Sequence, residues 1–439
     1  LLQYFSHLEL ESLPTGGWGY DHYPMSAKYA ATTGLDFLGM TGKFHTTWGE
    51  FGGYKHPNAL RYECAQMLAF GSKCSVGDQL HPSGLMDMTT YEIIGKAYSE
   101  VEAKEPWCGN VRNVADIAVL SSEAETGDRD PDTGAGRILL EGHFLFDIID
   151  RRTDFLAYKL LLLPDVVTVD DELKARLDAF LKHGGKLLIT GKSGLAKDGS
   201  GFAIDAGAQH FGESPNQPDY LEPGSSLAPS FVGSPLAMYM KSRQVKATTG
   251  EAIAGIRNPY FNRTWRHYSS HQHAPASDLS EYAAAVRNGN VLYLAHPIFS
   301  IYHALGAVAY KEYAVNAIKL LLGEDQSLRT NLPSAARVSL MKQESENRYV
   351  LHLLYASTIL RGAMAKLSPE GFVSDSKPVE VIEELLPLHD IEATLRLPRQ
   401  VKSVTLEPQG NEISFEIGEG CVSIKLDELV CHQMVVLHC

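Results

Sequence analysis

The chain has 439 residues, 44% of them hydrophobic and 21% charged, which is typical of a globular protein with two or three domains. A net charge of −14 without a basic stripe argues against a nucleic-acid partner. No apolar run approaches the roughly 20 residues that span a bilayer, so no membrane partner is expected. The six cysteines lack metal-ligand spacing, and the first residues do not read as a signal peptide. We therefore expect no metal or other cofactor, and a reducing, cytoplasmic location.

Three strand patterns alternate with three helix patterns in the first hundred residues. The strands are expected at 7–11, 35–40 and 73–77, and the helices at 25–33, 58–70 and 89–102. Each strand ends in polar and aromatic residues, as in a (β/α)8 barrel, whose chemistry lies at the carboxyl ends of its strands. A whole barrel needs eight strands and about 250 residues. We expect residues 1–110 to be the C-terminal portion of such a catalytic barrel, whose front is missing; the alternative is a small three-stranded unit.

Side chains suited to binding a sugar follow these predicted strands. Residues 39–50 read Gly-Met-Thr-Gly-Lys-Phe-His-Thr-Thr-Trp-Gly-Glu, so a cation, an imidazole, an indole and a carboxylate come directly after a strand. An indole can cover the C–H face of a sugar while polar groups bond its hydroxyls. An ordinary polar loop could carry the same residue types. The expected sugar-binding residues in this region are Trp18, Lys43, His45, Trp48, Asp78 and His81.

Three carboxylates are candidates for catalysis: Glu11, Glu50 and Glu9. Retaining glycosidases place two carboxyl groups about 5–5.5 Å apart across the scissile bond. Glu11 is the last residue of the first predicted strand, and Glu9 points the same way one step deeper. Glu50 follows the second strand. A structural ion pair or a helix cap is the alternative role for each.

The middle of the chain, residues 111–328, reads as a second α/β domain. Apolar strands are expected at 115–120, 158–163 and 186–191, and helices at 138–149 and 170–183, with a turn-rich stretch at 126–136. This alternation predicts a doubly wound parallel sheet, which resembles the class I glutamine amidotransferase fold. No cysteine lies between Cys108 and Cys421, so the nucleophile of those enzymes is missing. A structural or assembly role is therefore expected.

Residues 198–290 are rich in Gly, Pro and Ser and predict a long loop. Within it, His271 and His273 are two residues apart, so on an extended segment they would point the same way. Zinc would need further ligands that are not evident, so contact with carbohydrate or with another subunit fits better. Residues 329–439 switch to an alternating apolar pattern in several short stretches, which predicts an antiparallel β-sandwich.

The predicted order of partial barrel, amidotransferase-like domain and β-sandwich resembles the architecture of family 42 β-galactosidases. Several segments are similar in sequence to glycoside hydrolase family 151, the α-L-fucosidases that share this domain order. These segments are 8–18 (Leu-Glu-Leu-Glu-Ser-Leu-Pro-Thr-Gly-Gly-Trp), 39–53, 74–82, 266–275 and 432–436.

The resemblance implies retaining hydrolysis of terminal α-L-fucosides on fucosylated or related oligosaccharides. It also implies a homo-oligomer, a trimer held by the middle domain. In such a trimer we expect the loop at 265–273, with His271 and His273, to reach a neighbour's barrel mouth, because of its length and its aromatic and imidazole content. Glu11 would be the acid/base, with the nucleophilic aspartate on an earlier strand; in a family 42 alignment Glu11 falls beside the nucleophile motif instead. The remaining alternatives are a family 42 β-galactosidase and a non-catalytic carbohydrate-binding or oligomerisation module. Residues 1–439 alone are expected to be inactive.

Overall fold

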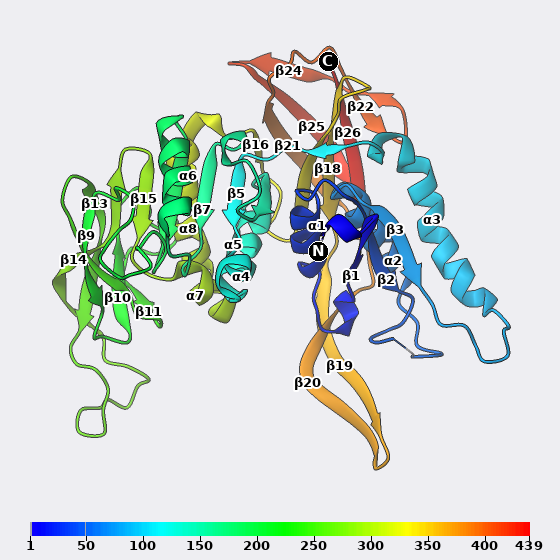
Figure 1. Cartoon of the computed structure of the whole chain (residues 1–439). Helices are drawn as coiled ribbons and strands as arrows, with labels where there is room; N and C mark the ends of the chain where they lie inside the picture. The colour runs from blue at the N-terminus through cyan, green and yellow to red at the C-terminus, as the bar shows by residue number, and fades with distance from the viewer. Residues whose placement is uncertain (1, 49) are drawn as a thin grey trace. The chain divides into compact units, whose positions relative to one another are not determined.

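A computed structural model describes residues 2–48 and 50–439, so Gly49 of the 39–50 segment lies outside the described residues (Figure 1). The chain forms two compact units. The first unit comprises Leu1–Ala115, His143–Asp147 and Ser327–Cys439, and the second comprises Asp116–Gly142 and Ile148–Gln326. None of the described helices is both long and apolar enough to cross a membrane.

The first unit opens with a three-stranded parallel sheet in the order β1-β2-β3. Its elements are η1 Leu2–Tyr4, β1 His7–Glu11, η2 Pro14–Gly16, α1 His22–Ala30, β2 Asp36–Gly42, α2 Pro57–Ala69, β3 Lys73–Gly77 and α3 Met88–Cys108. The predicted alternation of three strands and three helices is confirmed. In the register of the sheet, Glu11 lies beside Met40 and Gly42 beside Gly77, so the carboxyl ends of the strands are adjacent.

One face of this small sheet is covered by helices. Leu60 and Leu68 of α2 pack against Ala97 and Val101 of α3, with the half-buried Val76 of β3 against them. The strands themselves are poorly buried, because β1 and β3 contain no buried residue. Strands of a parallel sheet are normally buried on both faces, so this sheet has an open face.

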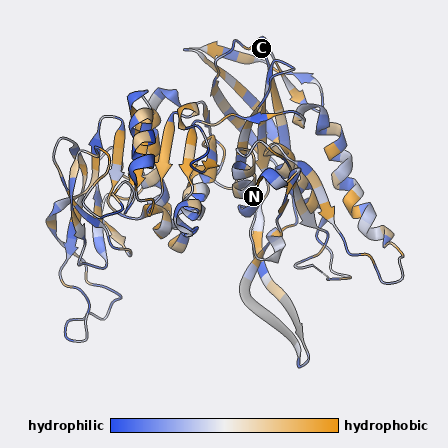
Figure 2. Ribbon diagram, in the orientation of Figure 1, coloured by the Kyte–Doolittle hydropathy of each residue, from blue (hydrophilic) through white to orange (hydrophobic). Residues whose placement is uncertain are grey.

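The second unit is built on a mixed nine-stranded sheet in the order β11-β10-β13-β14-β15-β8-β7-β5-β6. The strands β15, β8, β7 and β5 run parallel, as predicted for the three apolar stretches that form β5, β7 and β8. Every residue of β5 Ile117–Leu120, β7 Leu160–Leu163 and β15 Val291–Leu294 is buried, and Figure 2 shows hydrophobic residues along the central strands. The remaining elements of the parallel half are α4 Ser122–Thr126, α5 Asp130–Glu141, β6 Phe146–Ile149, η3 Phe155–Ala157, α6 Asp171–Lys182, β8 Lys186–Thr190, α7 Ile298–Leu305, α8 Val308–Leu322 and η4 Gly323–Asp325.

Three expectations for this region are wrong. The turn-rich stretch expected at 126–136 is mostly helical, because α5 begins at Asp130. The helix expected at 138–149 is instead the end of α5 followed by β6, because the chain breaks at Gly142 and at His143, whose φ is +56°. The long loop expected at 198–290 contains strands that are interrupted by glycines and bulges, so their alternation is hard to read. These strands are β9 Ala208–Glu213, β10 Asp219–Pro223, β11 Leu236–Met238, β12 Arg243–Ala247, β13 Glu251–Pro259 and β14 Ala276–Asn288.

The C-terminal region is rich in sheet, as predicted. One sheet has the order β16-β21-β25-β24 and another the order β23-β22-β26-β18-β17-β4. Leu395 and Val422 of the first sheet share a hydrophobic core with Leu340, Leu351 and Val435 of the second. The strands are β4 Arg112–Asn113, β16 Leu328–Thr330, β17 Arg337–Gln343, β18 Arg348–Tyr355, β21 Leu388–Arg396, β22 Ser403–Glu407, β23 Asn411–Glu412, β24 Phe415–Gly418, β25 Cys421–Leu429 and β26 Cys431–His438. A separate hairpin of β19 Thr358–Ser368 and β20 Gly371–Ile382, which the sequence did not predict, projects from this region (Figure 1).

Candidate active site

Trp48 lies across the carboxyl ends of the three parallel strands of the first unit. Its indole Nε1–H donates a hydrogen bond to Oε1 of Glu11, the last residue of β1. The same ring lies against Gly77, the last residue of β3, where any added Cβ would clash with it. Phe44 meets the indole edge to face at 5.1 Å between ring centroids. Glu11 and Trp48, which the sequence placed at the end of one strand and on the loop after another, are therefore in direct contact.

The three candidate carboxylates have different surroundings. Glu11 is half-buried and faces Trp48. Glu9 is exposed and lies two residues earlier on β1, which places it on the same side of the strand. The Glu50 carboxylate accepts hydrogen bonds from the backbone N–H of Thr46 at 2.6 Å and from its hydroxyl at 3.0 Å. These bonds close the loop around Trp48, so the contacts of Glu50 suit a structural role better than those of Glu11 do.

Lys43 is 3% exposed and lies just past the end of β2. Its backbone is held on both sides, because its N–H donates to the Gly77 carbonyl at 3.1 Å and its carbonyl accepts from the Lys55 N–H at 2.8 Å. Its ammonium lies 4.6 Å from the ring centroid of Tyr54 and 5.3 Å from that of Phe44. Among the residues that the structure describes, no acceptor forms a hydrogen bond or an ion pair with this ammonium.

Tyr54 and Asp87 belong to the same site, and sequence reasoning missed both. The Tyr54 hydroxyl donates to Asp87 Oδ2 at 2.7 Å, and this bond lowers the pKa of Asp87 with help from the Thr90 hydroxyl and the Lys43 charge. Asp87 also caps α3, because its Oδ1 accepts from the Thr89 N–H at 3.2 Å. The cap pattern Asp-Met-Thr-Thr at 87–90 was the available signal, but it lies ten residues beyond the end of β3.

The other residues expected to contact sugar in this unit lie at different positions around the same strand ends. Asp78 directly follows β3. The hydrogen bond that Tyr54 donates to Asp87 raises the pKa of Tyr54, and the negative charge of Asp78 raises it further. His45 is exposed on the Trp48 loop. His81 bonds the Ser83 hydroxyl within its own loop at 2.8 Å.

Trp18 is 45% exposed and packs edge to face on His22 at 4.7 Å. Its loop abuts the Trp48 loop, since a Cβ on Gly16 would come within 2.6 Å of the Thr46 carbonyl oxygen. No contact of Trp18 with Glu11 is found in the described part of the chain. The structure thus joins Glu11, Trp48, Lys43 and Asp78 through their strand ends, and it leaves Trp18, His45 and His81 around them.

His271 and His273 belong to the second unit and do not share an environment. His273 is half-buried between two tyrosines: its Nδ1 lies 2.8 Å from the Tyr220 hydroxyl and its Nε2 lies 3.3 Å from the Tyr239 hydroxyl. His271 is exposed. Within the described ranges, no group of three or more His, Cys, Asp or Glu side chains has the geometry of a metal site.

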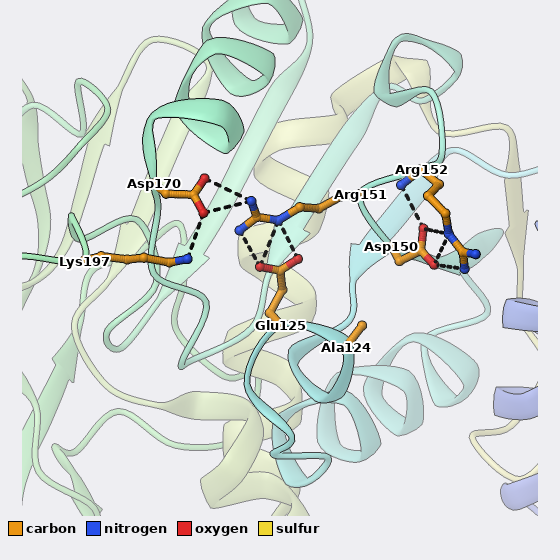
Figure 3. Close-up of a pocket in the computed structure, with 7 residues that line it drawn as sticks. All are labelled: Ala124, Glu125, Asp150, Arg151, Arg152, Asp170 and Lys197. Atoms are coloured by element: carbon orange, nitrogen blue, oxygen red, sulfur yellow. Dashed lines mark hydrogen bonds and ion pairs between the residues drawn. The ribbon is translucent and has the colours of Figure 1, made fainter. Parts of the chain in front are cut away.

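A second candidate is a depression of about 430 Å³ in the second unit, near the carboxyl ends of its parallel strands (Figure 3). Arg151 bonds both Glu125 (2.6 Å) and Asp170 (2.9 Å), and Lys197 bonds Asp170 at 2.7 Å. The bonds from Lys197 and from the backbone lower the pKa of Asp170 strongly. The full lining is Ala124, Glu125, Asp150, Arg151, Arg152, Asp170 and Lys197, with Arg152 paired to Asp150. Every charge in this depression is already paired, so it offers a ligand no free partner.

Comparison with known proteins agrees with the predicted resemblance. Residues 137–258 match the model of a domain described as the β-galactosidase trimerisation domain. The α-L-fucosidase isoenzyme 2 from Paenibacillus thiaminolyticus is 46% identical with a TM-score of 0.93, over 100% of this chain and 66% of that one. The chain resembles a GH42-like α-L-fucosidase. This finding confirms the resemblance that the sequence segments suggested.

More distant relatives agree with this result. β-Galactosidase GalA from Bacillus licheniformis is 25% identical over 251 residues, which are 49% of this chain and 37% of that protein. The β-galactosidase from Bacillus circulans sp. alkalophilus is 13% identical with a TM-score of 0.63, over 99% of this chain and 60% of that one, and this likeness concerns the fold alone. The chain thus spans about two thirds of the fucosidase and little more than a third of the curated galactosidase.

Proposed function

We propose that this chain is the larger part of a glycoside hydrolase that removes terminal α-L-fucose from fucosylated or related oligosaccharides with retention of configuration. The observation that carries the proposal is the contact of Glu11 with Trp48 at the carboxyl ends of three parallel strands, together with the buried Lys43 ammonium, which has no acceptor among the described residues. The 46% identity to an α-L-fucosidase over the whole chain favours fucose over other sugars.

We propose that β1, β2 and β3 are the last part of a (β/α)8 barrel. Their open face supports this, because a parallel sheet of this kind is stable only when further strands and side chains cover it. The proposed domains remain a barrel portion at 1–110, an amidotransferase-like domain at 111–328 and a β-sandwich at 329–439. The match of residues 137–258 to a trimerisation domain supports an assembly role for the middle one.

In the proposed mechanism Glu11 is the acid/base. It protonates the leaving oxygen while a second carboxylate, supplied by another strand of the barrel, attacks the anomeric carbon. Glu11 then removes a proton from the water that releases the sugar. Glu50 and Glu9 are the alternatives for this role, and the bonds of Glu50 to Thr46 make it the weaker of the two.

The proposed sugar contacts divide by chemistry. Trp48 and Trp18 present indole faces to the C–H side of the ring, while Lys43 and Asp78 bond hydroxyls. His45 and His81 are exposed on neighbouring loops and are proposed as outer contacts.

In the proposed homotrimer, the loop carrying His271 and His273 contacts a neighbouring subunit's barrel mouth. His271 is the better test, because His273 is held by Tyr220 and Tyr239 and its loss would disturb the loop itself. Unchanged turnover in His271→Ala of the full-length protein would remove this part of the proposal. A cytoplasmic location is also proposed, in keeping with six free cysteines.

Hydrolysis of nitrophenyl α-L-fucoside and nitrophenyl β-D-galactoside by the full-length protein tests the function. We expect fucoside hydrolysis with the α-anomer of fucose released first, as followed by proton NMR. Preference for the galactoside would establish the family 42 activity instead. Binding of L-fucose without hydrolysis of either substrate would establish the non-catalytic module.

A further inference from the structure

Two buried lysines on one loop of the first unit differ in their partners. Lys43 is 3% exposed and Lys55 is 2% exposed. The Lys55 ammonium donates to the Thr41 hydroxyl at 2.9 Å and pairs with Glu63 at 2.8 Å. The Lys43 ammonium has no such partner in the described part of the chain. A cation removed from water without an acceptor is unfavourable, so an acceptor from outside is expected at Lys43.

The Lys43 side chain is held in place from α3. Asp87 is fixed by the first turn of this helix, since it accepts from the Thr89 N–H and the Thr90 hydroxyl. Asp87 in turn fixes the hydroxyl of Tyr54, whose ring lies 4.6 Å from the Lys43 ammonium. Contact of an ammonium with the face of a tyrosine is attractive but leaves its N–H donors free for other partners.

The charges around Lys43 select the kind of ligand. The carboxylates of Asp87 and Asp78 both act on Tyr54, so an anionic ligand at Lys43 would lie near two negative charges. A cationic ligand would meet the ammonium itself. Neighbouring hydroxyls of a neutral sugar suit the ammonium and the carboxylates together. One hydroxyl can accept a hydrogen bond from the ammonium while the next donates to a carboxylate.

We propose that Lys43, Tyr54 and Asp87 form a subsite that recognises one hydroxyl of the substrate sugar, with Lys43 as its donor and Tyr54 and Asp87 as positioning residues. The inference rests on the proposed function and deepens it, because it assigns specificity to two residues outside the strand ends. The hydroxyl bond is made to ground state and transition state alike, so its loss raises KM more than it lowers kcat.

Kinetics of the full-length protein with nitrophenyl α-L-fucoside tests the subsite. Lys43→Met is expected to raise KM about 10- to 100-fold, as for loss of a charged hydrogen bond. Tyr54→Ala is expected to raise KM about 3- to 30-fold, and Tyr54→Phe, which keeps the ring but loses the hydroxyl that Asp87 fixes, is expected to restore only part of this loss. Tyr91→Ala, another exposed tyrosine of the first unit, is the matched control and is expected to match the wild type.

A series of monodeoxy fucosides identifies the hydroxyl. One of them is expected to react about 10- to 100-fold less well than the parent in the wild type, and this difference should disappear in Lys43→Met. An equal deoxy effect in both proteins would overturn the assignment of Lys43. Tyr54→Ala kinetics equal to wild type, with its melting temperature retained, would overturn the positioning role.

The same experiment separates this inference from the proposed function. If the wild type hydrolyses the fucoside and Lys43→Met does so equally well, the subsite is wrong and the function stands. If the wild type neither hydrolyses the fucoside nor binds L-fucose in a calorimetric titration, both are wrong. If it binds L-fucose without hydrolysis, equal binding by Lys43→Met overturns the subsite, and binding weakened about tenfold or more supports it.

Discussion

The parallel sheet of the first unit and the parallel half of the second unit's sheet differ in the polar groups at the carboxyl ends of their strands. In the first unit, Lys43 has no acceptor among the described residues, and Glu11 receives a hydrogen bond from Trp48. In the second unit, Arg151 is bonded by Glu125 and Asp170 together (Figure 3). Open α/β sheets and barrels bind ligands at this end of their strands. The comparison teaches that location alone does not mark a site; unpaired polar groups do.

The same sheets also differ in burial. β5 and β7 of the second unit are buried at every residue, whereas β1 and β3 of the first contain no buried residue. The parallel strands of the second sheet therefore have both faces covered, as is usual for parallel strands. The sheet of the first unit has an open face.

The largest expected effect is that of Glu11→Gln in the full-length protein. Loss of a general acid/base should lower kcat for nitrophenyl α-L-fucoside by about 10²- to 10⁴-fold. The fold should persist, because an amide of the same shape still accepts from the Trp48 indole. Steady-state kinetics and a melting curve check both statements.

Glu50→Gln is the control for Glu11. It weakens the bonds that the carboxylate makes to Thr46, so we expect a lower melting temperature with kcat within about tenfold of wild type. A larger loss of kcat in Glu50→Gln than in Glu11→Gln would exchange their proposed roles.

The two buried lysines should differ sharply in their effect on stability. Lys55→Met leaves the Glu63 carboxylate buried without its cation, which should lower the free energy of unfolding by about 3–5 kcal/mol. Lys43→Met removes a cation that has no acceptor in the described part of the chain, so we expect a change below about 1 kcal/mol. Urea denaturation of both variants measures the difference, and equal losses would show that Lys43 has a structural partner.

Acid should destabilise the first unit through a buried histidine pair. His352 Nδ1 and His432 Nε2 lie 3.0 Å apart, and burial lowers the pKa of His352 from 6.5 to about 3. The unfolded chain therefore binds a proton that the folded state does not, so stability is greatest above pH 6.5 and falls with decreasing pH until about 3.

The expected slope from His352 is about 1.4 kcal/mol per pH unit well below pH 6.5. Urea denaturation at several pH values measures the free energy of unfolding of the wild type and of His352→Leu. The variant lacks the titration of His352, so its free energy of unfolding should depend less on pH. Parallel pH dependence in the two proteins would mean that the pair takes up protons without unfolding.

A smaller effect is expected at the paired charges of the second unit. Arg151→Met leaves Glu125, whose side chain is 9% exposed, without its cation and should lower the free energy of unfolding by about 1–3 kcal/mol. Fucoside hydrolysis should stay at the wild-type level, because nothing here is left open for a ligand. Loss of turnover in a folded Arg151→Met would give this depression a functional role.

Much of the fold could be predicted where burial is complete. Continuous apolar runs such as 160–163 and 187–189 predict buried strands, because a strand that is apolar on both faces must be covered on both. The strands between 208 and 288 were not predicted, because half-exposed antiparallel strands with bulges show only a weak alternation of apolar and polar residues. The boundary at Gly142 and His143 depends on a positive φ that the apolar pattern did not signal.

The candidate site could be predicted only in part for a similar reason. Glu11, Lys43 and Trp48 lie at or near strand ends, where a rule about sheets points to them. Tyr54 and Asp87 lie further from the strand ends. Asp87 is held by its cap of α3 and bonds Tyr54, whose ring contacts the Lys43 ammonium, and sequence spacing does not predict these contacts.

A crystal structure of the full-length protein with L-fucose would show where the sugar binds. We expect the sugar at the ends of β1, β2 and β3, with its C–H face on Trp48 and a hydroxyl bonded to the Lys43 ammonium. A sugar bound in the Arg151 depression, with the Trp48 and Lys43 surfaces empty, would contradict this expectation.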